Sequence, residues 1–239
     1  MEPSPSPSAV VSEETLFFAE VAEGGSFNKW IELYNPTDEA VALDDIEITL
    51  IHSGLYSGRV ILGNGSSFSN PTGVDFIAPN AHLVICNPWA IESVDERNSR
   101  AVLTADDCDL VEKLINNFPV ITKYNGDDSL ILYVKETLVD VFGQSSTSST
   151  EFTVCGNSSA TKDKVLVRKS DVCRGNVEDL ASFGTSNSDC EWSILPINNI
   201  DNVNAHEANC GKKCVCTDVK VFVRMVKVIV RLVSCIFFF

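Results

Sequence analysis

The sequence is poor in the residue types on which most catalytic and nucleic-acid-binding sites depend. Its 239 residues include only 3 His, and 18 Lys plus Arg stand against 33 Asp plus Glu, for a formal net charge of −15. Nonspecific nucleic-acid binding depends on Lys and Arg that neutralise phosphates, so direct binding to nucleic acid is not expected. The chain also lacks a sustained heptad pattern, which excludes a coiled-coil rod.

Charge and composition divide the chain into three segments. Residues 1–211 carry 12 basic and 32 acidic residues, whereas residues 212–239 carry six basic residues and one acidic residue. A hydrophobic content of 44% is sufficient for a sizeable core. We therefore expect a disordered Pro/Ser-rich lead-in over residues 1–14, one folded domain over residues 15–209, and a Cys-rich, then basic and hydrophobic, tail over residues 210–239.

The cysteine content indicates an oxidising compartment. Nine cysteines are many for a cytosolic protein, and an odd number leaves at least one thiol free or paired between chains. Two N-glycosylation sequons begin at Asn64 and Asn157, both in polar, turn-rich stretches. The first residues have neither the basic nor the apolar region of a signal peptide. We resolve this conflict by expecting an incomplete N-terminus and an extracellular or cell-surface location, with membrane association as the alternative.

Short apolar or alternating runs, separated by turn residues, predict an all-β sandwich. Strands this short, with so few helices between them, argue against a parallel doubly wound sheet. The predicted strands are Leu16–Glu23, Trp30–Tyr34, Val41–Ile51, Arg59–Leu62, Val74–Ala78, His82–Cys86, Val120–Tyr124, Leu130–Lys135, Leu138–Phe142, Val165–Lys169 and Trp192–Leu195.

Two local patterns refine this prediction. Within Trp89–Asn117, the stretch Asp106–Ile115 has acidic residues at its start and apolar residues at helical spacing, so we expect a short helical excursion of one or two helices. Further on, the turn Asn125-Gly126-Asp127-Asp128 lies between two apolar runs. Because Asn-Gly supplies the positive φ that tight hairpins need, it predicts a hairpin between Val120–Tyr124 and Leu130–Lys135.

An ordered set of short motifs resembles the lamin-tail domain family. The most specific is Lys29-Trp30-Ile31-Glu32-Leu33-Tyr34-Asn35-Pro36, which follows a first strand Leu16–Val21. The later motifs, in the order of the family, are Leu83–Asn87, Asn125–Leu130, Val139–Gly143, Ala160–Asp163, Leu166–Lys169 and Glu191-Trp192. The resemblance covers roughly residues 15–207. It implies an immunoglobulin-like β-sandwich that serves as a binding or accessory module.

The resemblance is to the extracellular, microbial type of this family rather than to a nuclear lamin. A lamin would carry a coiled-coil rod before the domain, and Cys235 is fifth from the end where a prenylation box requires the fourth position. In microbial and algal proteins such modules often accompany secreted nucleases, phosphatases or adhesion domains. No companion catalytic domain of that kind is evident in the chain.

Two surfaces are candidates for ligand contact. Strict alternation places Trp30, Glu32 and Tyr34 on one face of a strand, with Ile31 and Leu33 directed into the core. This face is either a ligand-contact stripe or the ordinary outer face of a sheet.

The second candidate surface is the turn that contains Asn125, Asp127 and Asp128. Its carboxylates could help to hold Ca²⁺. The alternative is that Asx side chains satisfy backbone N–H groups in a tight turn. The three histidines lack the sequence context of a hydrolase or metalloprotease motif, so no catalytic residue is assigned.

The remaining candidates involve sulfur. His206, Cys210, Cys214 and Cys216 are four soft ligands close in sequence and could bind Zn²⁺. Disulfides from this strip to Cys173 or Cys190 are the favoured alternative. In the body, the spacing favours a disulfide between Cys86 and Cys108 that would tie the helical excursion to its strand; Cys155 is a further disulfide candidate. Connectivity beyond this stays open.

The tail has three possible structures. Lys220, Arg224, Lys227 and Arg231 fall on one face of a helix over residues 219–239, which is typical of a basic amphipathic helix at an anionic membrane. An unstructured or artefactual extension and an additional strand are the alternatives, because the segment is rich in Val.

The sequence therefore favours a non-catalytic binding or anchoring module of a secreted or surface protein. The alternatives are an accessory domain of a secreted nuclease or phosphatase, or a degenerate form of such an enzyme, and a peripheral membrane protein held by its tail.

Overall fold

A computed structural model describes residues 14–52, 55–91, 101–145 and 150–209, and the backbone of two short strands near the C-terminus. The predicted lead-in over residues 1–14 lies outside these residues except for its last position. Within the described residues the strands are β1 (Phe17–Glu23), β2 (Lys29–Asn35), β3 (Val41–Ala42), β4 (Ile46–His52), β5 (Leu55–Ile61), β6 (Phe68–Ser69), β7 (Phe76–Ile77), β8 (Ala81–Cys86), β9 (Leu110–Glu112), β10 (Ser129–Val134), β11 (Thr137–Phe142), β12 (Lys164–Arg168), β13 (Trp192–Leu195), β14 (Cys216–Val219) and β15 (Leu232–Cys235). The 3-10 helices are η1 (Leu43–Asp45), η2 (Pro88–Ala90), η3 (Ala105–Asp107) and η4 (Ala181–Phe183).

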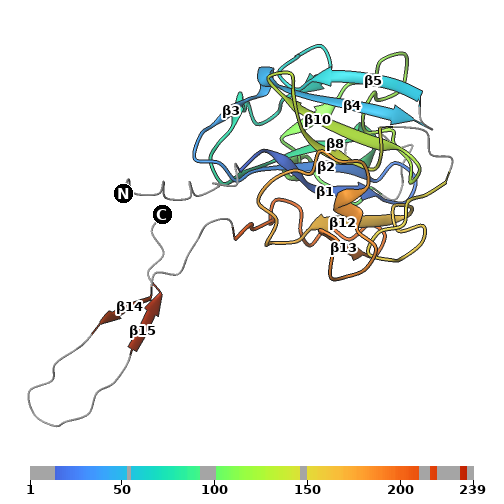
Figure 1. The fold of residues 1–239 in the computed structure, drawn as a ribbon. Coiled ribbons are helices and arrows are strands. Elements are labelled where there is room, and N and C mark those ends of the chain that lie inside the picture. Colours follow the sequence, from blue (N-terminus) through green and yellow to red (C-terminus); the bar gives the residue numbers. More distant parts are fainter. Residues whose placement is uncertain are drawn as a thin grey trace, which may run out of the picture.

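The body is a β-sandwich, which confirms the all-β prediction (Figure 1). A seven-stranded sheet has the order β13-β12-β1-β2-β8-β9-β6, and a four-stranded sheet has the order β11-β10-β4-β5. Every pair is antiparallel except β8 and β9, which run parallel. Two-stranded sheets, β3 with β7 and β14 with β15, are separate from these.

The main core lies between the two large sheets. Its apolar side chains alternate along the strands, as in Ile48 and Leu50 on β4 and Leu130 and Leu132 on β10. Ile31 and Leu33 on β2 are fully buried here, as the alternation predicted. Phe142, Phe183 and Trp192 close one end of the core with edge-to-face ring contacts.

A second layer covers the opposite face of the seven-stranded sheet. Trp30 and Val84 on this face pack against Leu103 and Cys108, which belong to the irregular segment after β8. Elsewhere on the same side of the molecule, Ala208 near the end of the body joins Phe17 and Tyr34 in a small apolar cluster. As a result, every residue of β1 and β2 is buried.

The helical excursion is smaller than the sequence predicts where the structure describes it, outside residues 92–100. Two 3-10 helices, η2 and η3, occur among these described residues, but the expected helix over Asp106–Ile115 is wrong beyond η3, because Leu110–Glu112 form strand β9. β9 pairs with β8, with Leu110 opposite Ile85. Backbone pairing with an existing sheet edge therefore prevails over the helical spacing of the apolar residues.

Two disulfides hold the body together. Cys86–Cys108 joins β8 to the segment before β9, as predicted. Cys155 pairs with Cys190, so the expected link from Cys190 to the strip Cys210–Cys216 is wrong. Cys173 is also disulfide-bonded, to a partner outside the described side chains.

The predicted hairpin at Asn125–Asp128 is wrong. β10 pairs with β4 and β11, not with Val120–Tyr124. The backbone N–H groups of residues 120–122 instead bond to the Glu112 carboxylate, at N–O distances of 2.6 to 2.8 Å. Gly126 is needed for close approach, because a Cβ there would lie 2.9 Å from Cα of Lys162. The Glu112 carboxylate on β9 and the loop that contains Lys162 therefore determine the conformation of residues 120–126.

The actual hairpin joins β10 to β11 through Lys135 and Glu136. Both residues adopt left-handed conformations, with φ of 48° and 63°. Such two-residue turns favour Asn-Gly, since other side chains are strained at positive φ.

We therefore expect the double substitution Lys135→Asn/Glu136→Gly to raise the free energy of unfolding by about 1 kcal/mol, by relieving this strain. Urea denaturation of the purified full chain measures the change. Gly126→Ala, at the Asn-Gly of the other turn, is the comparison: it should destabilise for a different reason, because a Cβ there would lie 2.9 Å from Cα of Lys162. Unchanged or lower stability of the double variant would contradict the turn assignment.

Loss of the Cys86–Cys108 disulfide should destabilise the fold, because this bridge closes a loop with a sequence separation of 22. We expect Cys86→Ala/Cys108→Ala to lower the free energy of unfolding by about 3 kcal/mol, since the unfolded chain gains entropy. Denaturation of both proteins without reductant checks the value, and non-reducing peptide mapping of the parent chain must recover the linked pair. A variant as stable as the parent would contradict this role.

Candidate functional site

Two glutamates face each other in the second layer. Glu20 on β1 is directly opposite Glu32 on β2, and their exposed fractions are 1% and 0%. The indole Nε1 of Trp30 donates to Glu20 Oε1 at 2.6 Å, while Glu20 Oε2 is buried without a hydrogen-bond partner. Two buried carboxyl groups of this kind are a common arrangement for acid–base chemistry, so their accessibility decides their role.

The second carboxylate is engaged both by its own sheet and by the covering layer. Glu32 Oε1 lies 2.9 Å from Nδ1 of His82, and Glu32 Oε2 accepts the backbone N–H of Asn204 at 2.8 Å. His206, two residues further on, is buried against the rings of Phe17 and Tyr34. Glu32 and the buried His206 ring therefore fasten the segment around residues 204–206 onto the sheet.

The predicted exposure of the Trp30, Glu32 and Tyr34 face is wrong. The three side chains do share one face of β2, but they are at most 3% exposed. Alternation within a strand shows which residues share a face, and remote segments cover this one. None of the three is available to a ligand at the surface in this conformation.

Burial sets the protonation of this layer. Burial, and then the charge of Glu32, raise the pKa of Glu20 to about 8, so Glu20 is protonated at neutral pH. Burial, and then the charges of His82 and Arg168, lower the pKa of His206 to about 4, so His206 is neutral. Neither of the two hollows described below is lined by Glu20 or His206. The pair is accordingly a structural clamp in the described conformation.

The Asn125–Asp128 turn uses its carboxylate internally. Asp128 accepts the backbone N–H of Asn125 at 2.7 Å and lies 2.9 Å from Nδ1 of His52. This is the turn chemistry that the sequence offered as the alternative to Ca²⁺. In the part of the chain that the structure describes, no group of three or more His, Cys, Asp or Glu side chains is placed to hold a metal ion.

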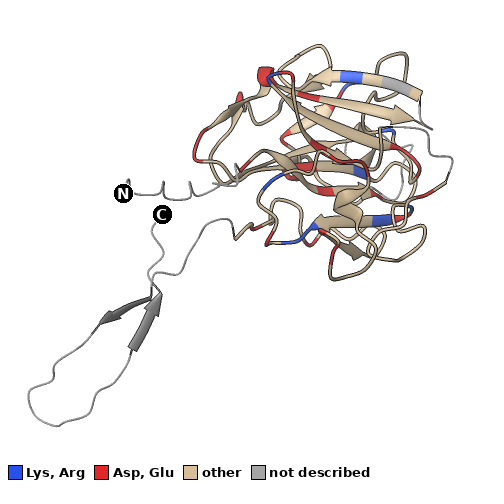
Figure 2. Ribbon diagram, viewed as in Figure 1, with Lys and Arg blue, Asp and Glu red and all other residues tan. Residues whose placement is uncertain are grey.

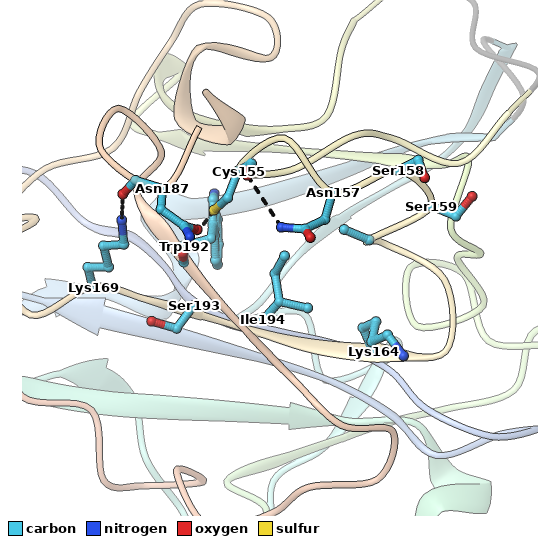
Figure 3. Close-up of a pocket in the computed structure, with 11 residues that line it drawn as sticks. Cys155, Asn157, Ser158, Ser159, Lys164, Lys169, Asn187, Trp192, Ser193 and Ile194 are labelled. Atoms are coloured by element: carbon cyan, nitrogen blue, oxygen red, sulfur yellow. Dashed lines mark hydrogen bonds between the residues drawn. The ribbon is translucent and has the colours of Figure 1, made fainter. Parts of the chain in front are cut away.

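An open groove of about 620 Å³ lies beside β13 (Figure 3). One wall is strand β13 itself, and the other is the segment that follows Cys155. Polar and apolar groups both line it: Cys155, Asn157, Ser158, Ser159, Ala160, Lys164, Lys169, Asn187, Trp192, Ser193 and Ile194. Its size is ordinary for a ligand site. Of these residues, only the disulfide candidate Cys155 and the sequon residue Asn157 are predicted site residues.

The groove differs in charge from the rest of the body. Acidic residues are spread over the body and basic residues are few (Figure 2). None of the 11 residues that line the groove is Asp or Glu, and two are Lys. Lys169 donates to the backbone oxygens of Asn187 and Cys190, so its charge is not neutralised by a carboxylate there. The groove is therefore a positively charged site on an acidic protein.

A second hollow, of about 540 Å³, lies on the outer face of the four-stranded sheet. It contains Glu47, Arg59 and Glu136. The Arg59 guanidinium lies 2.5 Å from the Glu47 carboxylate, so Glu136 leaves this hollow with a net negative charge, like the rest of the body. This leaves the groove beside β13 as the better candidate.

Both sequons lie in exposed turns. Asn64 Oδ1 accepts the backbone N–H and hydroxyl of Ser66, at 3.0 and 2.8 Å. Asn157 directs its amide at the backbone oxygens of Val154 and Cys155, on the groove wall. Glycosylation of either stays a prediction.

The tail predictions fall mostly outside the described residues. Of the zinc candidates, Cys210 and Cys214 lie there, as does the side chain of Cys216, so zinc binding stays a prediction. Of the three structures considered for residues 219–239, the strand is observed for Leu232–Cys235, which pair as β15 with β14, whereas the basic residues of the predicted helix, at 220–231, lie outside the described residues. Among the helices that are described, none is long and apolar enough to cross a membrane.

Comparison with protein-family models, curated proteins and solved structures finds no match. The resemblance to the lamin-tail domain therefore stays a prediction, and the groove must be interpreted from its own chemistry.

The raised pKa of Glu20 predicts a pH-dependent stability. Between pH 4.5 and about 8 the unfolded chain releases this proton and the folded chain keeps it, so rising pH favours unfolding. His206 acts in the opposite direction below pH 6.5, so the range from 6.5 to 8 isolates Glu20 from His206. We expect Glu20→Gln to flatten the loss of stability over this range, because the amide keeps the bond from Trp30 without a proton to release.

Chemical denaturation at a series of pH values measures this slope. Glu136→Gln, an exposed carboxyl in the β10–β11 turn, is the control and should leave the slope unchanged. Parallel profiles of the parent and Glu20→Gln would show that Glu20 is ionised in the fold.

Proposed function

We propose that this protein is a non-catalytic binding module of a secreted or cell-surface protein, and that the groove beside β13 is its ligand-contact site. The observation that carries the proposal is the groove itself: it is open, of ligand size, and free of acidic side chains on an otherwise acidic body. Its two walls are joined by the Cys155–Cys190 disulfide, which makes it a preformed site.

The disulfides support the location. Two bridges in the body fit an oxidising environment, as expected outside the cell or on its surface. The exposed sequons at Asn64 and Asn157 are compatible with the same route.

The placement of the titratable groups supports binding rather than catalysis. The carboxyl group with the most favourable pKa for acid–base chemistry, Glu20, is under the second layer. His52 and His82 are each held by a buried carboxylate, Asp128 and Glu32. A catalytic group must reach the substrate, and the groove presents ammonium, amide and hydroxyl groups instead.

The proposal is tested by selecting ligands for the full chain without assuming their chemistry. The chain is produced in an oxidising bacterial compartment, so that Asn157 carries no glycan, and is presented to a random-peptide display library and to a glycan array. We expect ligands that lose at least about tenfold in affinity for Ser158→Tyr, which fills the groove.

Ser69→Tyr is the matched control, since Ser69 is exposed on β6 at the opposite edge of the same sheet. It should bind as the parent does. Ligands that ignore Ser158→Tyr would place the site elsewhere, and turnover of phosphodiester or ester substrates by the purified chain would overturn the non-catalytic assignment.

A further inference from the structure

Resting on the proposed function, we infer that the groove binds an extended, acidic polypeptide segment that pairs with Ile194 on the free edge of β13. The inference combines three features: unpaired backbone groups, an uncompensated positive charge, and an apolar floor.

The register of the sheet shows which backbone groups of β13 are free. The N–H of Lys169 donates to the oxygen of Glu191 at 2.8 Å, at the end of the β12–β13 ladder. Residues in antiparallel pairs alternate between bonded and non-bonded positions, so Ser193 and Leu195 bond to β12. The N–H and C=O of Trp192 and Ile194 therefore point away from β12, toward the groove.

The disulfide and a proline limit the free edge to a short stretch. At one end, the sulfur of Cys155 lies 3.2 Å from the backbone oxygen of Trp192 and covers it. At the other end, Pro196 follows β13 and has no N–H to donate. Ile194 lies between these limits, and its donor and acceptor suit one bonded pair with an added strand.

The charge of the groove selects for acidic side chains. Lys164 is on β12 at the groove, and the carboxylate opposite it on β1, that of Glu23, is paired with Lys29 instead. Lys169 bonds only to neutral groups. An acidic segment would be repelled by most of this body, whose net charge is negative, and attracted at this place.

The apolar floor of the groove favours a segment in which apolar and acidic side chains alternate. Ile194 is half-buried and packs against the main core, and Ala160 is buried beside it. An extended segment directs successive side chains to opposite sides, so small apolar residues would face this floor and acidic residues would alternate with them. A sulfated glycan would satisfy the two lysines, and its hydroxyl groups can donate as well as accept, but it has no apolar side chains at a two-residue period to fill this floor.

The test uses defined peptides and the full chain. The probe is a capped peptide of about eight residues that alternates Val and Glu, compared with the same peptide of Val and Lys. Fluorescence anisotropy should show binding of the Glu peptide, at least about tenfold weaker binding of the Lys peptide, and weakening by salt. Lys164→Glu should reverse the preference, and Lys135→Glu, the same charge change in the β10–β11 turn, should not.

Backbone pairing is tested separately. A Glu peptide N-methylated at alternate residues on one edge should bind at least about tenfold more weakly than the peptide methylated on the other edge, because only one edge faces β13. Hydrogen exchange at the Ile194 amide should slow when the unmethylated peptide binds. Equal binding of both methylated peptides would overturn strand pairing.

The remaining outcomes separate this inference from the proposed function. Binding of a heparin-type sulfated oligosaccharide, lost in Ser158→Tyr, together with no binding of either peptide, would overturn the inference and leave the binding module intact. Absence of every ligand at the groove, combined with substrate turnover, would overturn both.

Discussion

The structure depends on the burial of β1 and β2 on both faces. One face packs into the core between the sheets, and the other lies under irregular segments that follow β8 and β13. Polar side chains on the covered face must find partners inside the protein, which is why Glu32 bonds to His82 and Asn204, and why Glu20 keeps its proton. The covering layer is itself fixed by the Cys86–Cys108 disulfide and by the Glu32 clamp.

A second buried charge joins the two sheets of the sandwich. Asp140 on β11 accepts hydrogen bonds from the Arg168 guanidinium, at 2.9 Å, and from the backbone N–H of Phe18 on β1, also at 2.9 Å. Arg168 additionally lies over the ring of Trp192. Isolated charges at these positions would be strongly unfavourable, so each partner requires the other. The contacts link β11 to β1, β12 and β13, and so connect the scaffold directly to the strand that borders the groove.

This arrangement separates the contacts that stabilise the fold from the proposed ligand groove. The titratable groups with the most perturbed surroundings are closed within the second layer, whereas the groove lies at a sheet edge, where backbone groups have not been used by a neighbouring strand. Sequence reasoning found little of this site, because the residues that line it come from segments brought together by the Cys155–Cys190 disulfide and the β12–β13 pairing. The one local signal is Pro196, which has no N–H to donate and so ends the short strand before it. Neither Lys164 nor Lys169 is distinguishable from a solvated lysine until the lining is known.

The sequence by itself determined the all-β class, most of the strands, the inward direction of Ile31 and Leu33, and the Cys86–Cys108 pair, because these follow from local alternation, turn residues and short loop closure. The tertiary structure decided which of the sheet faces directed away from the main core are exposed to solvent. It buried Trp30 and Tyr34, where alternation alone implied exposure. It also decided that Leu110–Glu112 extend the sheet and that Lys135 and Glu136 form the hairpin turn. The physical reason is common to all of these. A two-residue period shows which side chains share a face, but segments far away in the chain determine whether that face is buried and which strands pair.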